Sequence, residues 1–252
     1  MRLENTAAIV TGAASGLGAA TAHALASRKV QVFGFDLPSA IERAAEIDGV
    51  TYVGVDVTDA DQVAAAVATA ASTDFPLRAA VNCAGIAPSM RILGKKGPHD
   101  LALYARVIQV NLVGTFNVLA LAAAQIATAE PLEHGQRGAI VNTASIAAYE
   151  GQVGQAAYAS SKGGVVGLTL PAARDLAQYG IRVNTIAPGI VETPMLATVS
   201  EEFRAGLAAG VPFPQRLARP DEYADLALFL LEHDYLNGEV VRMDGALRMA
   251  PR

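Results

Sequence analysis

The stretch Ala7-Ala8-Ile9-Val10-Thr11-Gly12-Ala13-Ala14-Ser15-Gly16-Leu17-Gly18 carries a short apolar run, a glycine-rich turn and the first residues of a helical pattern. Glycines let the backbone turn sharply and approach a pyrophosphate, which the positive end of a helix attracts. The same Gly-x3-Gly-x-Gly spacing also suits tight packing of a helix on a strand. Its place between the first strand and the first helix favours a dinucleotide site. The predicted cofactor contacts in this turn are Gly12, Ser15, Gly16, Leu17 and Gly18.

Strand-like and helical runs alternate from this stretch to the end of the chain. Most strand-like runs are continuously apolar, as expected for parallel strands covered on both faces. Their order predicts right-handed crossovers, and hence an α/β Rossmann fold with a doubly wound parallel sheet of about seven strands and helices on both faces. We expect residues 1–252 to form a single domain. The strands are predicted at 7–11, 30–36, 51–55, 79–82, 139–143, 182–187 and 239–243, and the helices at 16–28, 39–47, 59–71, 101–128, 156–178 and 221–231.

Two segments rich in proline and glycine interrupt this alternation. Residues 87–100 follow the fourth strand, and residues 188–220, with a short helix near 201–208, follow the sixth. Open α/β sheets bind their ligands at the carboxyl ends of the strands. Both segments are therefore predicted to be loops that border a substrate.

The composition excludes several classes of protein. A formal net charge of −5 without a basic stripe argues against a nucleic-acid surface. Gly, Asn, Gln or charged residues interrupt every apolar run short of the roughly 20 residues that span a membrane. The single cysteine, Cys83, indicates a reduced compartment. Because the first strand begins by about Ala7, we expect no signal peptide and a cytoplasmic location.

Polar residues end the next strands at the predicted cofactor edge. Asp36 ends the second strand, where a carboxylate accepts hydrogen bonds from an adenosine ribose and repels a 2′-phosphate. Since the glycine turn carries no Arg or Lys, the predicted cofactor is NAD rather than NADP. A turn or capping role is the alternative for Asp36, and a cap of the helix near Asp59 is nearly as good an interpretation of Asp56. The further predicted cofactor contacts are Asp56, Val57, Asn82, Ala84 and Gly85.

Tyr158 and Lys162 form the candidate proton-transfer pair. Their i, i+4 spacing places both side chains on one face of a helix. A fixed ammonium group favours the phenolate, so we expect Lys162 to lower the pKa of Tyr158 from its usual value of about 10. Ser145, which follows the fifth strand, is placed to donate to a substrate oxygen beside the tyrosine. These groups suit the interconversion of an alcohol and a carbonyl.

Taken together, these motifs resemble the short-chain dehydrogenase/reductase family over essentially the whole chain. The resemblance implies a catalytic tetrad of Asn111, Ser145, Tyr158 and Lys162. In it, Tyr158 is the general acid and base, Ser145 polarises the carbonyl, Lys162 holds the nicotinamide ribose and Asn111 supports a relay water. It also implies a homotetramer. The matching elements are Thr11 to Gly18, Asp56, Asn82 to Gly85, Asn111, Ser145, Tyr158, Lys162, Asn184, and the segment with Pro188, Gly189, Ile190 and Thr193, which implies further contacts to the nicotinamide.

Within that family, the second half is similar to the type 2 3-hydroxyacyl-CoA dehydrogenases, also described as 17β-hydroxysteroid dehydrogenases of type 10. The similarity lies in Asn142 to Ser145, in residues 150–158, in Val211-Pro212-Phe213-Pro214 and in Leu236 to Val240. It implies a 3-hydroxyacyl-CoA or 3-oxoacyl-CoA substrate that contacts Ser145, Gln155 and Tyr158. Lys95 and Lys96 are candidates to meet the phosphates of coenzyme A, and a solvated loop tip is the alternative.

Several other interpretations stay open. Within the enzyme class, they are a hydroxysteroid dehydrogenase and a general carbonyl or 3-oxoacyl carrier-protein reductase. From a different class comes a non-catalytic NAD-binding scaffold protein, although Tyr158 and Lys162 are both retained. No metal site is predicted, since the four histidines, His23, His99, His134 and His233, lack the spacing of metal ligands.

Overall fold

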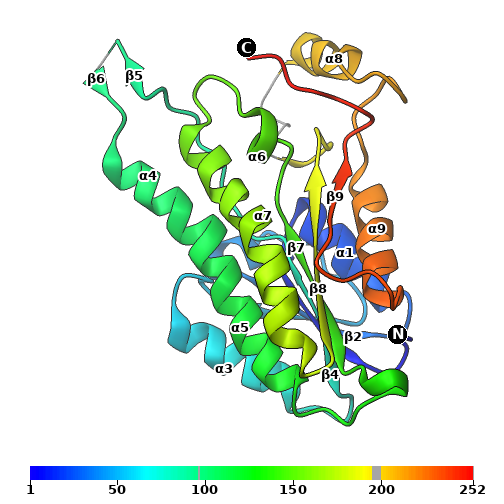
Figure 1. Ribbon diagram of the computed structural model, residues 1–252. Helices are drawn as coiled ribbons and strands as arrows, with labels where there is room; N and C mark the ends of the chain where they lie inside the picture. Colours follow the sequence, from blue (N-terminus) through cyan, green and yellow to red (C-terminus); the bar gives the residue numbers. More distant parts are fainter. Residues whose placement is uncertain (96, 195–199, 252) are drawn as a thin grey trace.

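A parallel sheet covered by helices on both faces forms the centre of the computed structural model, which describes residues 1–95, 97–194 and 200–251 (Figure 1). The seven strands lie in the order β3-β2-β1-β4-β7-β8-β9, and every neighbouring pair is parallel. The predicted fold class is therefore confirmed. The strands are β1 (Ala7–Thr11), β2 (Gln31–Asp36), β3 (Val50–Gly54), β4 (Leu77–Asn82), β7 (Gly138–Thr143), β8 (Ile181–Pro188) and β9 (Val240–Met243).

The helices divide between the two faces of the sheet. Helices α3, α5 and α7 bury their apolar side chains in one core, and α1 and α9 bury theirs in the other. The helices are α1 (Gly16–Ala26), α2 (Pro38–Ile41), α3 (Ala60–Ala71), α4 (Leu101–Ile108), α5 (Thr115–Ile126), α6 (Ala147–Glu150), α7 (Ala156–Ala177), α8 (Glu201–Ala209) and α9 (Pro220–Glu232), with a π-helical turn at Gln109–Gly114 and a 3-10 turn at Glu133–Gly135.

Strand β1 shows why the strands are apolar throughout. Ala7 and Ile9 belong to the core beneath α3, α5 and α7, whereas Ala8 and Val10 belong to the core beneath α1 and α9. Successive side chains of a strand point to opposite faces, and here both faces are covered. Each central strand therefore joins two apolar cores.

Two predicted helices and one predicted loop differ from the structure. The helix expected at 39–47 is only α2, because the residues after it bury few apolar groups and a short helix depends on such burial. The helix expected at 101–128 contains the π-helical turn between α4 and α5. The loop expected at 87–100 carries β5 (Leu93–Gly94) and β6 (Gly97–Pro98), an antiparallel pair. We call residues 87–100 the arm, since they project beyond α4 (Figure 1).

The stretch Leu101–Ile126 is long and apolar enough, by length and composition alone, to cross a membrane, since an 18-residue window within it has a mean hydropathy of 1.7. Half of that window is buried, and Val118, Leu119 and Ala122 lie in the core beneath the sheet. A core helix of a globular protein has the same composition.

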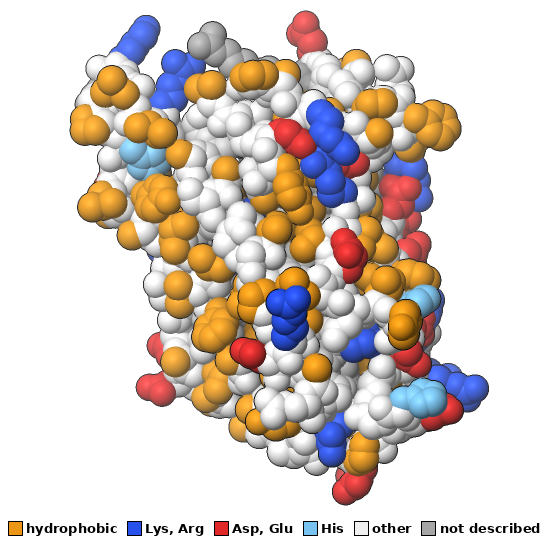
Figure 2. All heavy atoms as spheres, in the orientation of Figure 1, with side chains coloured by type: hydrophobic (Ala, Val, Ile, Leu, Met, Phe, Trp, Pro, Cys, Tyr) orange, Lys and Arg blue, Asp and Glu red, His pale blue; other side chains and the backbone are white. Residues whose placement is uncertain are grey.

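Helices α4, α5 and α7 also share an exposed face that carries apolar side chains (Figure 2). Leu101 is 78% exposed, Phe116 52% and Leu170 44%, and Val113 of the π-helical turn is 41% exposed. We call this surface the α5–α7 face.

The carboxyl ends of the strands gather the segments that follow them. Strands β8 and β9 point towards the edge at which the arm, α6, α8 and the C-terminus lie (Figure 1). The strand order reverses between β1 and β4, and such a reversal is the point at which open α/β sheets bind ligands. The glycine-rich turn and residues 83–86 leave the sheet at this point.

Candidate functional site

The glycine-rich turn after β1 needs its glycines for two different reasons. Gly12 and Gly16 have φ of +67° and +54°, a region that favours glycine. A Cβ atom on Gly18 would lie 2.1 Å from the carbonyl oxygen of Gly12, so only glycine lets α1 start this close to the turn. The Ser15 side chain caps no N–H group of α1 among the described residues. The amide groups of the first helical turn, including that of Leu17, therefore suit an anion such as a pyrophosphate.

Asp36 lies beside this turn, as predicted. Its carboxylate accepts hydrogen bonds from the backbone N–H groups of Ala14, at 2.9 Å, and Leu37, at 2.8 Å. The turn role that was the alternative for Asp36 is therefore real. Each carboxylate oxygen still has a second acceptor position for a ribose hydroxyl. The two roles are compatible, and the ribose contact stays a prediction.

Asp56 and Val57 line the next part of this edge. The cap of α3 is Asp59, which accepts hydrogen bonds from two backbone N–H groups of the helix, so Asp56 is not that cap. Asp56 instead accepts hydrogen bonds from Thr58, and Arg106 lies 3.7 Å away. Burial opposes ionisation of Asp56, but these partners outweigh it and lower its pKa. Val57 is buried in the core.

The segment from Asn82 to Gly85 separates into supporting and accessible residues. The Asn82 side chain is 2% exposed and donates to Asn142 at 2.9 Å, so it supports the sheet and does not reach the open edge. The backbone N–H of Ala84 donates to the Thr11 hydroxyl. Gly85 is exposed, and a Cβ atom there would lie 3.2 Å from Asn111 Oδ1 and 3.6 Å from Lys162 Nζ. Even one added carbon would be tight against the Asn111 amide oxygen, so glycine lets this segment pass close to both groups.

Lys162 lies one helical turn after Tyr158 on α7. Its Nζ donates to the main-chain oxygen of Thr143 at 2.7 Å and lies 5.8 Å from the centre of the Tyr158 ring. Lys162 is 4% exposed, and burial lowers its pKa from 10.5 to about 8. The amino group is thus held under the end of β7, close to Gly85.

The pKa of Tyr158 corrects one expectation. Burial raises it above its usual value of 10, and the smaller effect of a hydrogen bond with Ser145 lowers it. The predicted lowering by Lys162 is wrong for this state of the protein. The reason is geometric, because the Lys162 amino group is directed at the Thr143 carbonyl while the phenol is desolvated.

Ser145 is positioned by the continuation of β7 along β8. The backbone N–H groups of Ala144 and Ile146 donate to carbonyl oxygens of β8, so the chain stays extended past the end of β7. The Ser145 Oγ accepts a hydrogen bond from the Ala147 N–H at 3.1 Å, and the residue is 8% exposed. Its hydroxyl proton is directed by this contact and remains for Tyr158 or a substrate oxygen.

Asn111 lies in the π-helical turn and is fully buried. Its side-chain amide bonds both the N–H and the C=O of Ile86, at 2.8 and 2.9 Å, and donates to Ser161 Oγ at 3.0 Å. Asn111 therefore ties the segment after β4 to α7 next to Lys162. Two features of the sequence could indicate this irregular turn: Asn111 is a polar residue in an apolar helix, and Gly114 lies nearby. A Cβ atom on Gly114 would lie 2.7 Å from Val57 Cγ2.

The segment after β8 bends back over the glycine-rich turn. Pro188 ends β8, and a Cβ atom on Gly189 would lie 3.0 Å from the backbone of Asp244. Ile190 packs in a small apolar cluster with Ile146. A Cβ atom on Gly16 would lie 3.5 Å from the Thr193 side chain. The structure therefore brings this segment to the same edge, and residues 195–199 of the predicted loop lie outside the described residues.

A groove of about 410 Å³ lies beside the start of α7. One wall is the arm, with Arg91, Ile92 and Leu93, and the other is formed by residues 151–156 and Ala159. Gln155 lines the groove, and its Oε1 also accepts the Gln152 N–H at 3.0 Å, which holds the loop; its contact with a substrate stays a prediction.

The C-terminal tail supports this groove, which the sequence did not reveal. The Gln152 side chain and the Val153 N–H donate to the main-chain oxygens of Ala250 and Pro251. Arg242 holds the same region through two hydrogen bonds to Glu150. No motif marked these contacts, because they join segments about 100 residues apart in the chain.

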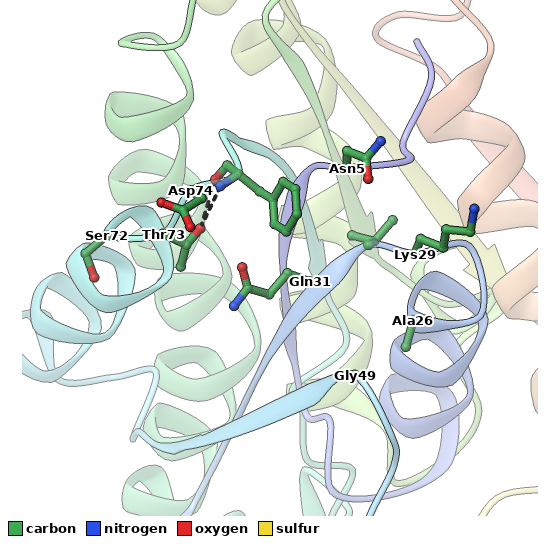
Figure 3. Close-up of a pocket in the computed structure, with 10 residues that line it drawn as sticks. Asn5, Ala26, Lys29, Gln31, Gly49, Ser72, Thr73 and Asp74 are labelled. Carbon is green, nitrogen blue, oxygen red and sulfur yellow. Dashed lines mark hydrogen bonds between the residues drawn. The ribbon is translucent and has the colours of Figure 1, made fainter.

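A larger groove, of about 670 Å³, lies at the opposite edge of the sheet (Figure 3). It borders the starts of β1, β2, β3 and β4 and is lined by residues such as Asn5, Lys29, Gln31 and Asp74. None of the predicted catalytic side chains is among its lining residues. Within residues 1–95, 97–194 and 200–251, no group of three or more His, Cys, Asp and Glu side chains is placed to hold a metal ion. The predicted catalytic side chains lie together at the carboxyl edge instead, around Asn111 and Lys162.

Known proteins share this architecture and much of the sequence. The family described as enoyl-(acyl carrier protein) reductase matches residues 12–247. A 3-hydroxyacyl-CoA dehydrogenase type-2 of Drosophila melanogaster is 52% identical, over 99% of this chain and 100% of that protein. The protein of the same description from Homo sapiens is 51% identical, over 97% and 95% of the two chains. A crystal structure of such a protein from Mycobacterium avium has a TM-score of 0.92 and 47% identity, covering 99% and 98% of the two chains.

Proposed function

Because the chain belongs to the short-chain dehydrogenase/reductase family, whose dehydrogenases typically use a nicotinamide cofactor, we propose that this oxidoreductase uses NAD and interconverts 3-hydroxyacyl-CoA and 3-oxoacyl-CoA esters. The observation that carries the proposal is the approach of Ser145, Tyr158 and Lys162 to one another at the carboxyl edge of the sheet. The relatives that are about half identical over nearly the whole chain support the same substrate class.

The three side chains divide the work on the substrate oxygen. When bound, the nicotinamide ring exchanges a hydride with the substrate carbon. The Ser145 hydroxyl donates a hydrogen bond to the substrate oxygen, while the Tyr158 hydroxyl gives it a proton during reduction or takes one during oxidation. The raised pKa of Tyr158 keeps the phenol protonated, which suits the reduction step. Lys162 and Asn111 lie next to each other close to Gly85, and in the proposed reaction Lys162 holds the nicotinamide ribose.

Asp36 supports NAD over NADP. Its carboxylate lies at the end of β2 against the glycine-rich turn, where a 2′-phosphate would meet a negative charge. Wild-type protein should therefore use NADH in preference to NADPH at equal concentration. A hydrogen bond to a charged group contributes about 1.5–3 kcal/mol, so Asp36→Ala combined with Leu37→Arg should move the kcat/KM ratio towards NADPH at least about tenfold. Equal use of both cofactors by the wild type would contradict the assignment.

The arm supports an acyl-CoA ester. It places apolar Ile92 and Leu93 in the groove wall and carries the positive charges of Arg91, Lys95 and Lys96. The backbone N–H of Met90 donates to the Gly154 oxygen at 2.8 Å, so the two walls are joined at their base. The acyl chain and pantetheine fit the groove, and the lysines meet the phosphates. Lys96 lies outside the described residues.

The decisive experiment is a steady-state panel of acetoacetyl-CoA, branched acyl-CoA esters, a hydroxysteroid and a carrier-protein thioester, measured with NADH or NAD. Acetoacetyl-CoA should be reduced with the highest kcat/KM. Tyr158→Phe should lower kcat at least about 10²-fold, because general acid catalysis is removed. Tyr235→Phe changes a tyrosine that is 96% exposed and serves as the matched control.

The panel also separates the alternatives. A preference for the steroid or for the carrier-protein thioester would replace the acyl-CoA assignment, and binding of NADH without turnover of any ketone would indicate a scaffold protein. Replacing Lys95 and Lys96 with Ala should raise the KM for acetoacetyl-CoA several-fold. Lys29→Ala, at the opposite edge of the sheet, is the control, and an unchanged KM in the double variant would reject the phosphate role.

We further propose that copies of this chain form a homotetramer through the α5–α7 face. On α7, a Cβ atom on Gly163 or Gly167 would meet nothing within 4 Å among the described residues, whereas one on Gly164 would collide with Leu112. Gly164 therefore serves packing within the chain. Gly163 and Gly167, together with the exposed Phe116 and Leu170, leave a face that a second helix can approach closely.

A further inference from the structure

Tyr223 is a fully buried tyrosine that the proposed reaction does not use. It lies on α9, is 0% exposed, and brings its hydroxyl to the end of β7, 2.6 Å from Thr143 Oγ1. Burial raises its pKa well above 10, so the hydroxyl keeps its proton. A polar group in this position is costly unless it is bonded, so the contact with Thr143 is structurally required.

The direction of the hydrogen bonds around Tyr223 follows from the donors present. The Thr143 hydroxyl has one proton, which it donates to the main-chain oxygen of Asn82 at 2.6 Å. The Tyr223 hydroxyl must therefore donate to Thr143 Oγ1. The Cys83 thiol donates in turn to the Tyr223 oxygen at 3.6 Å. The result is a directed series from Cys83 through Tyr223 and Thr143 to Asn82, across the ends of β4 and β7.

Thr143 connects this series to the active site through its main chain. Its carbonyl oxygen accepts the hydrogen bond from Lys162 Nζ at 2.7 Å. That carbonyl is the one hydrogen-bond partner of the Lys162 amino group among the described residues. Anything that fixes the Thr143 residue therefore fixes the position of the ammonium group. The side chain and the main chain of one residue join α9 to α7.

From this geometry we infer that Tyr223 is a positioning residue for Lys162: its hydroxyl holds Thr143, and the Thr143 carbonyl holds the amino group where the reaction needs it. The inference rests on the proposed function only for its effect on turnover. An oxygen that accepts a hydrogen bond from the charged ammonium form of a lysine favours that charged form. Loosening Thr143 should therefore lower the pKa of Lys162 further, as well as slowing the reaction.

The test is Tyr223→Phe, which keeps the ring and removes one hydroxyl. The chain has four lysines, Lys29, Lys95, Lys96 and Lys162, so an NMR titration of protein with 13C-labelled lysine side chains resolves Lys162, and Lys162→Met assigns its signal. In the wild type, Lys162 should titrate at about 8. In Tyr223→Phe its pKa should fall by about 0.5, and kcat for acetoacetyl-CoA reduction should fall about fivefold with little change in KM, as expected for one buried hydrogen bond.

Thr185→Val is the matched control. Thr185 Oγ1 also makes a buried hydroxyl contact of 2.6 Å, with Thr169 of α7, but its side chain makes no hydrogen bond with Thr143 among the described residues. The Thr185→Val variant should have a lower Tm but an unchanged pKa of Lys162. If Tyr223→Phe lowers the Tm alone and leaves the Lys162 pKa unchanged, the inference is overturned.

Two further results keep the inference separate from folding and from the proposed function. If Tyr223→Phe does not fold, Thr143→Val breaks the same contact from the other side and should lower the Lys162 pKa in the same direction. An unmoved pKa there overturns the inference as well. If the wild type reduces no ketone, the proposed function fails, but the NMR titration still decides the position of Lys162.

Discussion

Burial acts in opposite directions on the two side chains that handle the proton. It raises the pKa of the Tyr158 phenol and lowers that of the Lys162 ammonium group to about 8, because in both cases the charged form loses its hydration. Both groups are therefore closer to neutrality than the same side chains in water. The i, i+4 spacing predicted their shared helix face, but the depth of the face in the protein sets their pKa values.

The lowered pKa of Lys162 makes stability depend on pH. Between about pH 8 and 10.5 the folded protein has released this proton while the unfolded chain still binds it, so the free energy of unfolding should rise with pH in this window. The contribution is at most about 3 kcal/mol. Lys162→Met should lack it. Urea unfolding of both proteins at pH 7.5 and pH 10 measures the effect, and a wild-type-to-variant difference that does not change with pH would refute it.

At the scale of a single element, the helix that joins the arm to the core is interrupted by an irregular turn. Residues 101–126 run through α4, a π-helical turn and α5. The wider turn places Asn111 against Ile86 and Ser161, and Gly114 against Val57. The irregular turn thus joins three elements at the position where the amide is needed.

Gly114→Ala tests the packing of this turn. The added methyl group would lie 2.7 Å from Val57 Cγ2, so the variant should lose about 1–3 kcal/mol of unfolding free energy. It should also weaken activity, because Asn111 lies in the same turn. Gly206→Ala is the control, since its methyl group meets nothing within 4 Å of the described residues on exposed helix α8. That variant should gain up to about 1 kcal/mol. Equal stabilities for the two variants would contradict the packing explanation.

At the scale of the whole molecule, the α5–α7 face is an apolar helical surface that is exposed and not packed against the sheet. Its apolar side chains and the open positions at Gly163 and Gly167 motivate the proposed tetramer. A charged side chain in the centre of such an interface would be desolvated without a partner.

Gly167→Arg should therefore dissociate the tetramer without unfolding the chain. Size exclusion with light scattering should show a mass of about four chains for the wild type and a smaller mass for the variant. Gly206→Arg, on α8, introduces the same charge at another open position and should leave the mass unchanged. A wild type that elutes as a monomer, or a Gly167→Arg protein that stays tetrameric, would rule out this face.

The cytoplasmic location stays a prediction from composition.

The strands, the glycine-rich turn, the place of Asp36, and the shared face of Tyr158 and Lys162 were predictable because each depends on local spacing. A continuous apolar run in a strand, a glycine at positive φ and an i, i+4 pair are each visible within a few residues of sequence. The resemblance to a known family supplied Asn111, whose role no local pattern indicated.

The tertiary structure decided everything that depends on burial or on contacts between distant segments. It paired the Asn82 side chain with Asn142, directed Lys162 at Thr143 and reversed the expected change in the Tyr158 pKa. It also placed Tyr223 behind Lys162 and the C-terminal tail against the groove. The sequence alone determined which groups stand at the carboxyl edge of the sheet. Only the packed structure determines their desolvation and their partners, because these arise between residues that are far apart in the chain.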